Sequence, residues 1–381
     1  MGMRRGIRLN RILDKYCGIT LLAPLGMLRS KRRMPEGINR IGILSAAALG
    51  DTLLLSGPIA DIRAHFPAQE LILFCSPENL AAAQLVPGLD KRVVYPWLRP
   101  AQAVKSLRTD HLDLLIDFTP WARLTALYAL FSGAGFTIGF RTPGQCRHFG
   151  YDLAVDRSGL RHELENFRLL IRELGIVGQS SPTIAIPKVS LPRDLDEKNL
   201  VLLHLWPSGT RSWLREWSQD RWVELAQRLR GLVTNPHFVI TGSPGDKSRS
   251  IEFLEKLRLA GLSGSVFTGQ DGLGTLCRVV LASHLVVSTN TGVMHLAAIL
   301  GAPTVSINGP TNNARWGPVG PNAIGVNSPG QGCGFLDLGF EFDGNPADCM
   351  GRISVEQVLE AVQRVLKRRA THIGPWQPVP G

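Results

Sequence analysis

Residues 289–295, TNTGVMH, contain Thr291, Gly292 and His295 at a spacing suited to phosphate binding. Residues 285–288 are expected to form a buried parallel strand, and from Thr291 onward the apolar positions follow a helical period. A helix that begins there offers free backbone N–H groups and a positive dipole end, which suit a phosphate. Gly292 would let that ligand approach, and His295 would share a helix face with Thr291. An ordinary strand, turn and helix with a capped start would show the same spacing.

A carboxylate stands at a second strand-to-helix turn. Leu49, Gly50 and Asp51 follow an apolar strand expected over residues 41–46 and open a helix. At such a turn Asp51 could simply be an N-cap. It could also be a general base, because it would lie at the carboxyl edge of a parallel sheet and could take a proton from a hydroxyl nucleophile.

The same alternation of strands and helices is expected in both halves of the chain. Strands expected over residues 71–75, 92–95, 112–118 and 136–140 alternate with helices, and the alternation restarts at 201–205 after a proline-containing stretch. This pattern indicates α/β domains with parallel sheets. The predicted division is a basic arm over 1–37, a Rossmann-like domain over 38–180, a linker over 181–198, a second Rossmann-like domain over 199–353, and a helix with a tail over 354–381.

The positive charge of the chain is concentrated at its start. The net charge is +11, and residues 1–40 contribute ten Lys or Arg against two Asp or Glu, a balance of +8. The apolar run over residues 18–28 is too short for a spanning helix of about twenty residues, and basic residues follow it in place of a cleavage site. A short apolar run with basic flanks fits a membrane-surface anchor on anionic lipid. A solvated arm and a short helix packed on the body are the alternatives.

The cysteines and short motifs exclude several classes. Six scattered cysteines without an export signal are expected to be reduced thiols, although Cys333 and Cys349 could pair. The chain has neither GxGxxG nor GxxxxGK[ST], which argues against a dinucleotide oxidoreductase and a P-loop NTPase. The DLD triplet over 194–196 is interpreted as a solvated acidic turn, so no metal site is predicted.

Residues 289–311, TNTGVMHLAAILGAPTVSINGPT, resemble the donor-site motif of glycosyltransferase family 9, the heptosyltransferases of lipopolysaccharide core synthesis. The family usually has Asp-Thr-Gly where this chain has Asn290, Thr291 and Gly292. The Leu-Gly-Asp loop over 49–51 is similar to a second family signature. Residues 215–222 resemble a third, with Arg215 in place of the family's lysine. The resemblance covers roughly residues 38–368. It implies a GT-B fold, two Rossmann-like domains facing a central cleft, with the last helix packing back on the first domain.

The resemblance also implies roles for these residues. Asp51 would be the base that deprotonates the acceptor hydroxyl, with Leu49 and Gly50 in the same acceptor-side loop. Arg215 would bind the donor diphosphate, with Arg211 as a second candidate, although tryptophans packing a loop beside an exposed arginine would explain the same residues. The remaining candidate donor contacts are Asn290, Thr291, Gly292, His295, and Asp246, which could contact the ribose or merely cap a helix.

The implied activity is inverting transfer of a heptose, or a related sugar, from an ADP-sugar to the lipopolysaccharide core or another lipid-linked acceptor. The expected partners are the nucleotide-sugar, the lipid-linked saccharide and the inner-membrane surface, but not nucleic acid. No metal or other cofactor is expected, and the expected location is cytoplasmic, on the inner face of the cytoplasmic membrane. The alternatives are a transferase or GT-B epimerase that uses another nucleotide-sugar, and a non-catalytic protein that binds membrane or nucleic acid. Asn290 leaves the donor sugar open.

Overall fold

The computed structural model describes residue 14 and residues 20–46, 48–209, 211–269, 272–336 and 347–372, without the side chains of 369–372. It forms two compact units, Met1–Ala185 and Ile186–Gly381. Their boundary lies within the range predicted for the linker. Most of the predicted arm before residue 20 and the tail after residue 372 lie outside the described residues.

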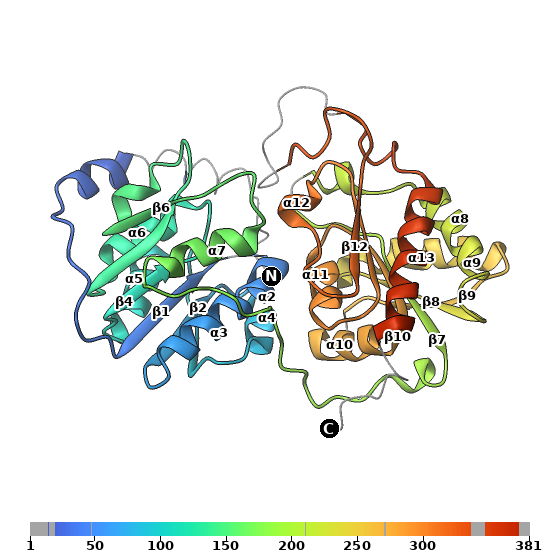
Figure 1. Cartoon of the computed structure of the whole chain (residues 1–381), viewed down its shortest axis with the longest axis horizontal. Helices are drawn as coiled ribbons and strands as arrows, with labels where there is room; N and C mark the ends of the chain where they lie inside the picture. Colours follow the sequence, from blue (N-terminus) through green and yellow to red (C-terminus); the bar gives the residue numbers. More distant parts are fainter. Residues whose placement is uncertain are drawn as a thin grey trace. The chain divides into compact units, whose positions relative to one another are not determined.

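The first unit is built on one parallel sheet of six strands in the order β3-β2-β1-β4-β5-β6 (Figure 1). The residues of β1 and β2 are almost all buried, because helices cover both faces of the sheet and favour continuous apolar runs. The strands are β1 (Arg40–Ser45), β2 (Glu70–Cys75), β3 (Lys91–Val94), β4 (Leu114–Asp117), β5 (Phe136–Arg141) and β6 (Leu153–Asp156), and the α-helices are α2 (Leu49–Leu54), α3 (Ser56–His65), α4 (Leu80–Leu85), α5 (Pro100–Thr109), α6 (Arg123–Phe131) and α7 (Glu163–Arg172).

The second unit repeats this topology, with the strand order β12-β11-β10-β7-β8-β9. In each sheet the first strand of the unit lies at the centre, so the strand order reverses between β1 and β4 and again between β7 and β10. The strands are β7 (Asn199–His204), β8 (Pro236–Thr241), β9 (Ser263–Phe267), β10 (Ser283–Thr289), β11 (Thr304–Asn308) and β12 (Ala323–Asn327), and the α-helices are α8 (Gln219–Leu229), α9 (Lys247–Leu259), α10 (Gly272–Ala282), α11 (Gly292–Ile299), α12 (Asn313–Trp316) and α13 (Val355–His372). The predicted α/β architecture of two Rossmann-like domains is confirmed.

The last helix, α13, packs within the second unit. Its apolar residues Val358, Val362 and Val365 are buried in the same core as Trp222 and Leu225 of α8. It also contacts β11 and β12. The apolar face of α13 therefore covers its own sheet, and the packing of this helix on the first domain stays a prediction.

Two cysteines depart from the prediction of reduced thiols. Cys333 and Cys349 form a disulfide, with their Cα atoms 5.7 Å apart. Backbone hydrogen bonds from Gly334 to Gly309 and from Leu336 to Pro310 hold the segment that carries Cys333 beside the loop after β11. The sequence left this pairing open, and the tertiary contacts decide it. Cys75, Cys146 and Cys277 are free thiols.

Among the helices that the structure describes, none has both the length and the apolar character that crossing a membrane requires.

Candidate functional site

The strongest candidate site lies at the strand-order reversal of the second unit, outside the carboxyl ends of β7 and β10, where open α/β sheets bind ligands. Arg215 joins the segments that follow these two strands. Its Nη2 donates to the carbonyl oxygen of Ser208, after β7, and its Nη1 donates to that of Asn290, after β10, at 3.5 Å. Arg215 ends a short 3-10 turn, Ser212–Arg215, so the loop itself places the guanidinium.

The charge of Arg215 is not balanced by a carboxylate among the residues that the structure describes. Burial lowers the pKa of its guanidinium from the ordinary value, but an arginine remains protonated in proteins. A partly desolvated cation with only neutral acceptors can gain charge-assisted hydrogen bonds from an incoming anion. Arg215 is therefore suited to a phosphate ligand.

The start of α11 lies beside Arg215 and supplies a second anion-binding feature. Thr291 is the N-cap, but its side chain does not cap the helix; its hydroxyl lies 3.2 Å from that of Ser288. The amide of His295 closes the first turn on the carbonyl of Thr291 at 3.4 Å, and His295 itself is buried. The first-turn N–H groups from Gly292 onward thus receive no acceptor from the cap side chain, as a phosphate at a helix N-terminus requires.

The side chain of Asn290 points into the domain. It is almost fully buried, and its Nδ2 donates to Oδ1 of Asn308 and to the carbonyl oxygen of Trp316, both at 2.8 Å. Because the Trp316 carbonyl can only accept, the amide must face it with its NH₂ group. Asn290 therefore offers the site its backbone, whereas its side chain ties the end of β10 to β11 and α12.

Asp246 is engaged at the start of α9. Its Oδ2 accepts from the backbone N–H and the hydroxyl of Ser243, at 2.7 and 2.6 Å, and its Oδ1 accepts from Nε of Arg249 at 3.0 Å. Burial raises the pKa of Asp246, but the hydrogen bonds from Ser243 and Arg249 outweigh it and hold the pKa below the ordinary value. Asp246 therefore stabilises the helix start in the structure. A ribose hydroxyl would have to share the oxygens of Asp246 with Ser243 and Arg249.

Arg249 connects the Asp246 turn to the loop after β7. It pairs with Glu216, beside Arg215, at 2.9 Å, and its guanidinium lies 4.2 Å from the ring centroid of Trp206. Neither contact could be predicted from the sequence, where the partners are 33 and 43 positions apart. Arg249 is therefore a positioning residue of the candidate site.

Asp51 lies at the strand-order reversal of the first unit. It is the third residue of α2, not its N-cap, and its Oδ2 accepts from the backbone N–H of Ala48 at 3.3 Å. Leu49 and Gly50 are the two preceding helical residues, of which Gly50 is buried. The half-buried carboxylate of Asp51 thus stands at the carboxyl edge of β1.

A buried ion pair that the sequence did not reveal supports this loop. Asp117, at the end of β4, binds Nη2 of Arg147 at 3.0 Å and the hydroxyl of Tyr151 at 2.7 Å. Its other oxygen accepts from the N–H of Thr119 at 2.8 Å, and Thr119 Oγ1 accepts from the N–H of Ala46 at 3.1 Å. In the sequence, the only sign of this ion pair is Asp117, a charged residue at the end of the otherwise apolar strand β4.

No group of three or more His, Cys, Asp or Glu side chains able to hold a metal ion occurs in the described part of the chain.

Known proteins resemble this chain in sequence and in fold. Residues 101–334 match the family model described as glycosyltransferase family 9 (heptosyltransferase). Lipopolysaccharide heptosyltransferase 1 of Escherichia coli O18:K1:H7 is 28% identical over 324 residues, which cover 77% of this chain and 92% of that protein. Lipopolysaccharide heptosyltransferase 1 of Pseudomonas aeruginosa is 30% identical over 131 residues, so the match spans only 34% of each protein.

A solved structure extends the likeness to nearly the whole fold. Escherichia coli heptosyltransferase WaaC with ADP-2-deoxy-2-fluoro heptose has a TM-score of 0.64 at 17% identity, and the match covers 85% of this chain and 99% of that one. The predicted GT-B fold class is confirmed.

Proposed function

Because the chain belongs to glycosyltransferase family 9, the heptosyltransferase family, we propose that it transfers a heptose, or a related sugar, from an ADP-sugar to the lipopolysaccharide core or another lipid-linked acceptor. The observation that carries this proposal is the juxtaposition of Arg215 with the uncapped start of α11. A nucleoside diphosphate presents the charge that both features attract.

The proposed reaction inverts the anomeric carbon in one displacement. The acceptor oxygen bonds to that carbon as the bond to the diphosphate oxygen breaks, and the hydroxyl proton passes to Asp51. The departing diphosphate gains negative charge, which Arg215 and the N–H groups at Gly292 stabilise. Donors already in place for that charge cost no reorganisation during the reaction. The first unit therefore supplies the base, and the second unit supplies the leaving-group site.

Two further residues are proposed to contact the donor. His295 lies one turn into α11 and is proposed to support the diphosphate from its buried position. Asp246 is proposed to reach the ribose while it keeps its bonds to Ser243 and Arg249. The inward side chain of Asn290 means that its difference from the family's aspartate does not by itself argue for a different donor.

The proposal includes a place of action and a cofactor requirement. A lipid-linked acceptor would bring the enzyme to the inner face of the cytoplasmic membrane as a peripheral protein. Transfer is proposed to need neither a metal nor another cofactor, because Arg215 and the helix start supply the charge that a bound cation would otherwise provide.

The decisive experiment is Asp51→Asn. An amide oxygen can still accept from Ala48, so the melting temperature and the affinity for ADP should remain those of the unmodified protein. Turnover with ADP-heptose and the native acceptor should fall about 10²–10⁴-fold, because an amide cannot take the hydroxyl proton at neutral pH. Asp220→Asn, the same change in the first turn of α8, is the matched control and should leave turnover unchanged. Normal turnover of Asp51→Asn would show that Asp51 is not the base. Failure of ADP to bind would show that the donor is not an ADP-sugar.

A further inference from the structure

The segment before β1 is built into the first unit. Residues 20–27 are helical, and Leu22 is fully buried in the same core as Leu44 and Tyr151. Gly26 approaches the body so closely that a Cβ there would lie 2.2 Å from the carbonyl oxygen of Phe149. The helix is therefore fixed in its rotation, with Leu22 and Gly26 facing inward.

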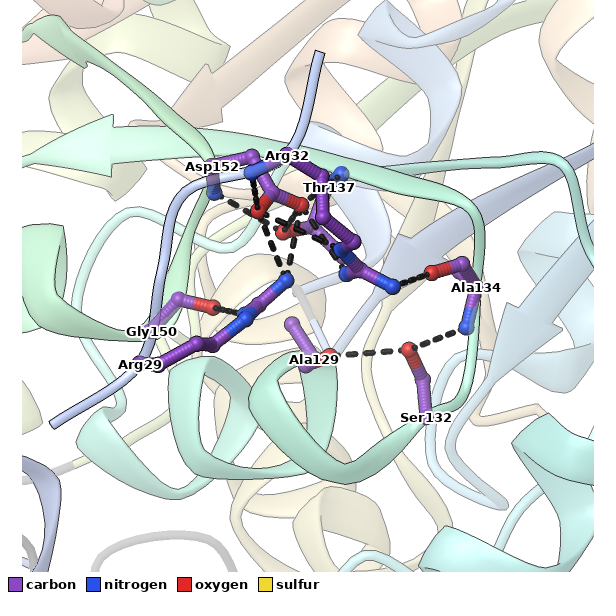
Figure 2. Close-up of polar contacts among 8 residues, drawn as sticks. All are labelled: Arg29, Arg32, Ala129, Ser132, Ala134, Thr137, Gly150 and Asp152. Carbon is purple, nitrogen blue, oxygen red and sulfur yellow. Dashed lines mark hydrogen bonds and ion pairs between the residues drawn. The ribbon is translucent and has the colours of Figure 1, made fainter. Parts of the chain in front are cut away.

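The buried carboxylate of Asp152 binds the segment just after this helix (Figure 2). Asp152 accepts from Nη2 of Arg29 at 2.7 and 2.8 Å, and from Nη2 and the backbone N–H of Arg32 at 2.9 and 3.0 Å. Thr137 adds two donors at 2.9 Å. Burial raises the pKa of Asp152, but these hydrogen bonds and the charge of Arg29 lower it below the ordinary value. The two arginines are thus used to hold the segment in place.

A neighbouring face of the helix is apolar and exposed. Leu21, Leu25 and Leu28 are 48%, 37% and 85% exposed, and Met27 is 72% exposed. The amide of Leu28 still bonds to the carbonyl of Pro24 at 3.1 Å, so the helical spacing extends to this residue. Positions 21, 25 and 28 share one side of a helix. Apolar side chains gathered on a fixed helix, and not scattered singly, mark an interaction surface.

Two exposed cations follow this helix closely in the chain. Lys31 and Arg33 are exposed, and neither has an ion-pair partner among the residues that the structure describes. Lys31 also lies near the body, because burial and the charges of Arg141 and Lys31 together lower the pKa of His148. Exposed leucines and exposed cations therefore occur together within residues 21–33.

We propose that the outer face of residues 20–28 docks on a bilayer of anionic phospholipid, with Leu21, Leu25 and Leu28 among the acyl chains and Lys31 and Arg33 at the headgroup phosphates. Anionic lipid satisfies both parts of the surface, since apolar burial and attraction of cations add in interfacial binding. A second copy packed on this face would bring like charges together, which disfavours self-association. The inference deepens the lipid-linked acceptor of the proposed function, but its test contains no sugar and can succeed or fail independently.

The test is co-sedimentation of the full chain with phosphatidylglycerol and phosphatidylcholine vesicles. Leu25→Glu/Leu28→Glu should lower the partition onto phosphatidylglycerol at least about tenfold, because it removes two leucine side chains from the acyl chains and adds two carboxylates near anionic headgroups. Leu160→Glu/Leu259→Glu is the matched control, since these leucines are 90% and 89% exposed elsewhere. It should bind as the unmodified protein does. Truncation is a poor test, because it would unpair Asp152 and remove Leu22 from the core.

The charged residues give an independent measurement. Lys31→Ser/Arg33→Ser should weaken binding at low salt and matter less at high salt, because salt screens exposed charges. Binding to phosphatidylcholine should be weaker than to phosphatidylglycerol throughout. Equal vesicle binding by the unmodified protein and Leu25→Glu/Leu28→Glu would overturn the proposal. So would a dimer in sedimentation velocity that these two substitutions dissociate, if the unmodified protein does not bind vesicles.

Discussion

Asn290→Asp introduces the residue that the family usually has, yet the structure predicts that it destabilises the second unit. Nδ2 of Asn290 donates at 2.8 Å to both Asn308 Oδ1 and the Trp316 carbonyl. A carboxylate at this position would lose both bonds and place a buried charge against two acceptor oxygens. Asn308 could turn its amide, but Oδ1 of that residue also accepts from Ser306 at 2.9 Å. The Trp316 carbonyl has no such freedom.

The magnitude follows from these contacts. Two lost hydrogen bonds are worth about 0.5–1.5 kcal/mol each, and an unpaired buried group adds about 1–3 kcal/mol. A loss of about 2–6 kcal/mol corresponds to a melting-temperature decrease of at least about 4 °C for a domain of this size. The carboxyl's pKa would be raised in the folded state, so the loss should be full at neutral pH and shrink as the pH falls through that raised value, where the protonated group can donate again.

The assay is thermal unfolding from pH 5 to 8, with Asn312→Asp as the matched control. Asn312 is the exposed N-cap of α12, and its Oδ1 accepts from Ala314 at 2.9 Å, a bond that aspartate can also accept. The control should therefore melt within about 1 °C of the unmodified protein. Equal melting temperatures for Asn290→Asp and Asn312→Asp at pH 7 would show that the two bonds donated by Asn290 do not stabilise the second unit.

Three further outcomes are expected. Arg215→Gln should weaken ADP binding about tenfold or more in titration calorimetry, because it removes a charge-assisted bond worth about 1.5–3 kcal/mol; unchanged affinity would place the diphosphate elsewhere. Asp152→Asn should destabilise the first unit at pH 7 in urea unfolding. Since the folded-state pKa of Asp152 is lowered, this difference should diminish as the pH falls below the ordinary value of 3.8, and a constant difference would contradict the ion-pair explanation. Reduction of Cys333–Cys349, which closes a separation of 16 residues, should lower the stability of the second unit by about 2–3 kcal/mol in urea unfolding with and without dithiothreitol; equal midpoints would contradict this.

The basic arm is held by a residue that lies far from it in the sequence. Composition showed that positive charge gathers in residues 1–40, and it favoured a membrane-surface anchor over a solvated arm or a packed helix. The structure shows a helix packed on the body, and the membrane-surface anchor stays a proposal. Leu22, Arg29 and Arg32 pack on the body, whereas Leu21, Leu25 and Leu28 stay outside. Which cations are used internally depends on Asp152, 120 or more positions away, and no local pattern contains that information.

Features that depend on neighbouring residues could be predicted from the sequence. Apolar runs and helical periods gave two Rossmann-like domains, because strand burial and helix amphipathicity repeat over a few positions. The Leu49–Gly50–Asp51 turn and the start of α11 were likewise visible, since each is a strand followed directly by a helix. The contacts of those side chains became visible only in the folded chain. It turned Asn290 inward to Trp316, engaged Asp246 with Ser243 and Arg249, and packed α13 against α8. Except for the bonds within the Asp246 turn, these contacts join residues far apart in the chain, and they form only when the sheet brings the ends of its strands to one edge.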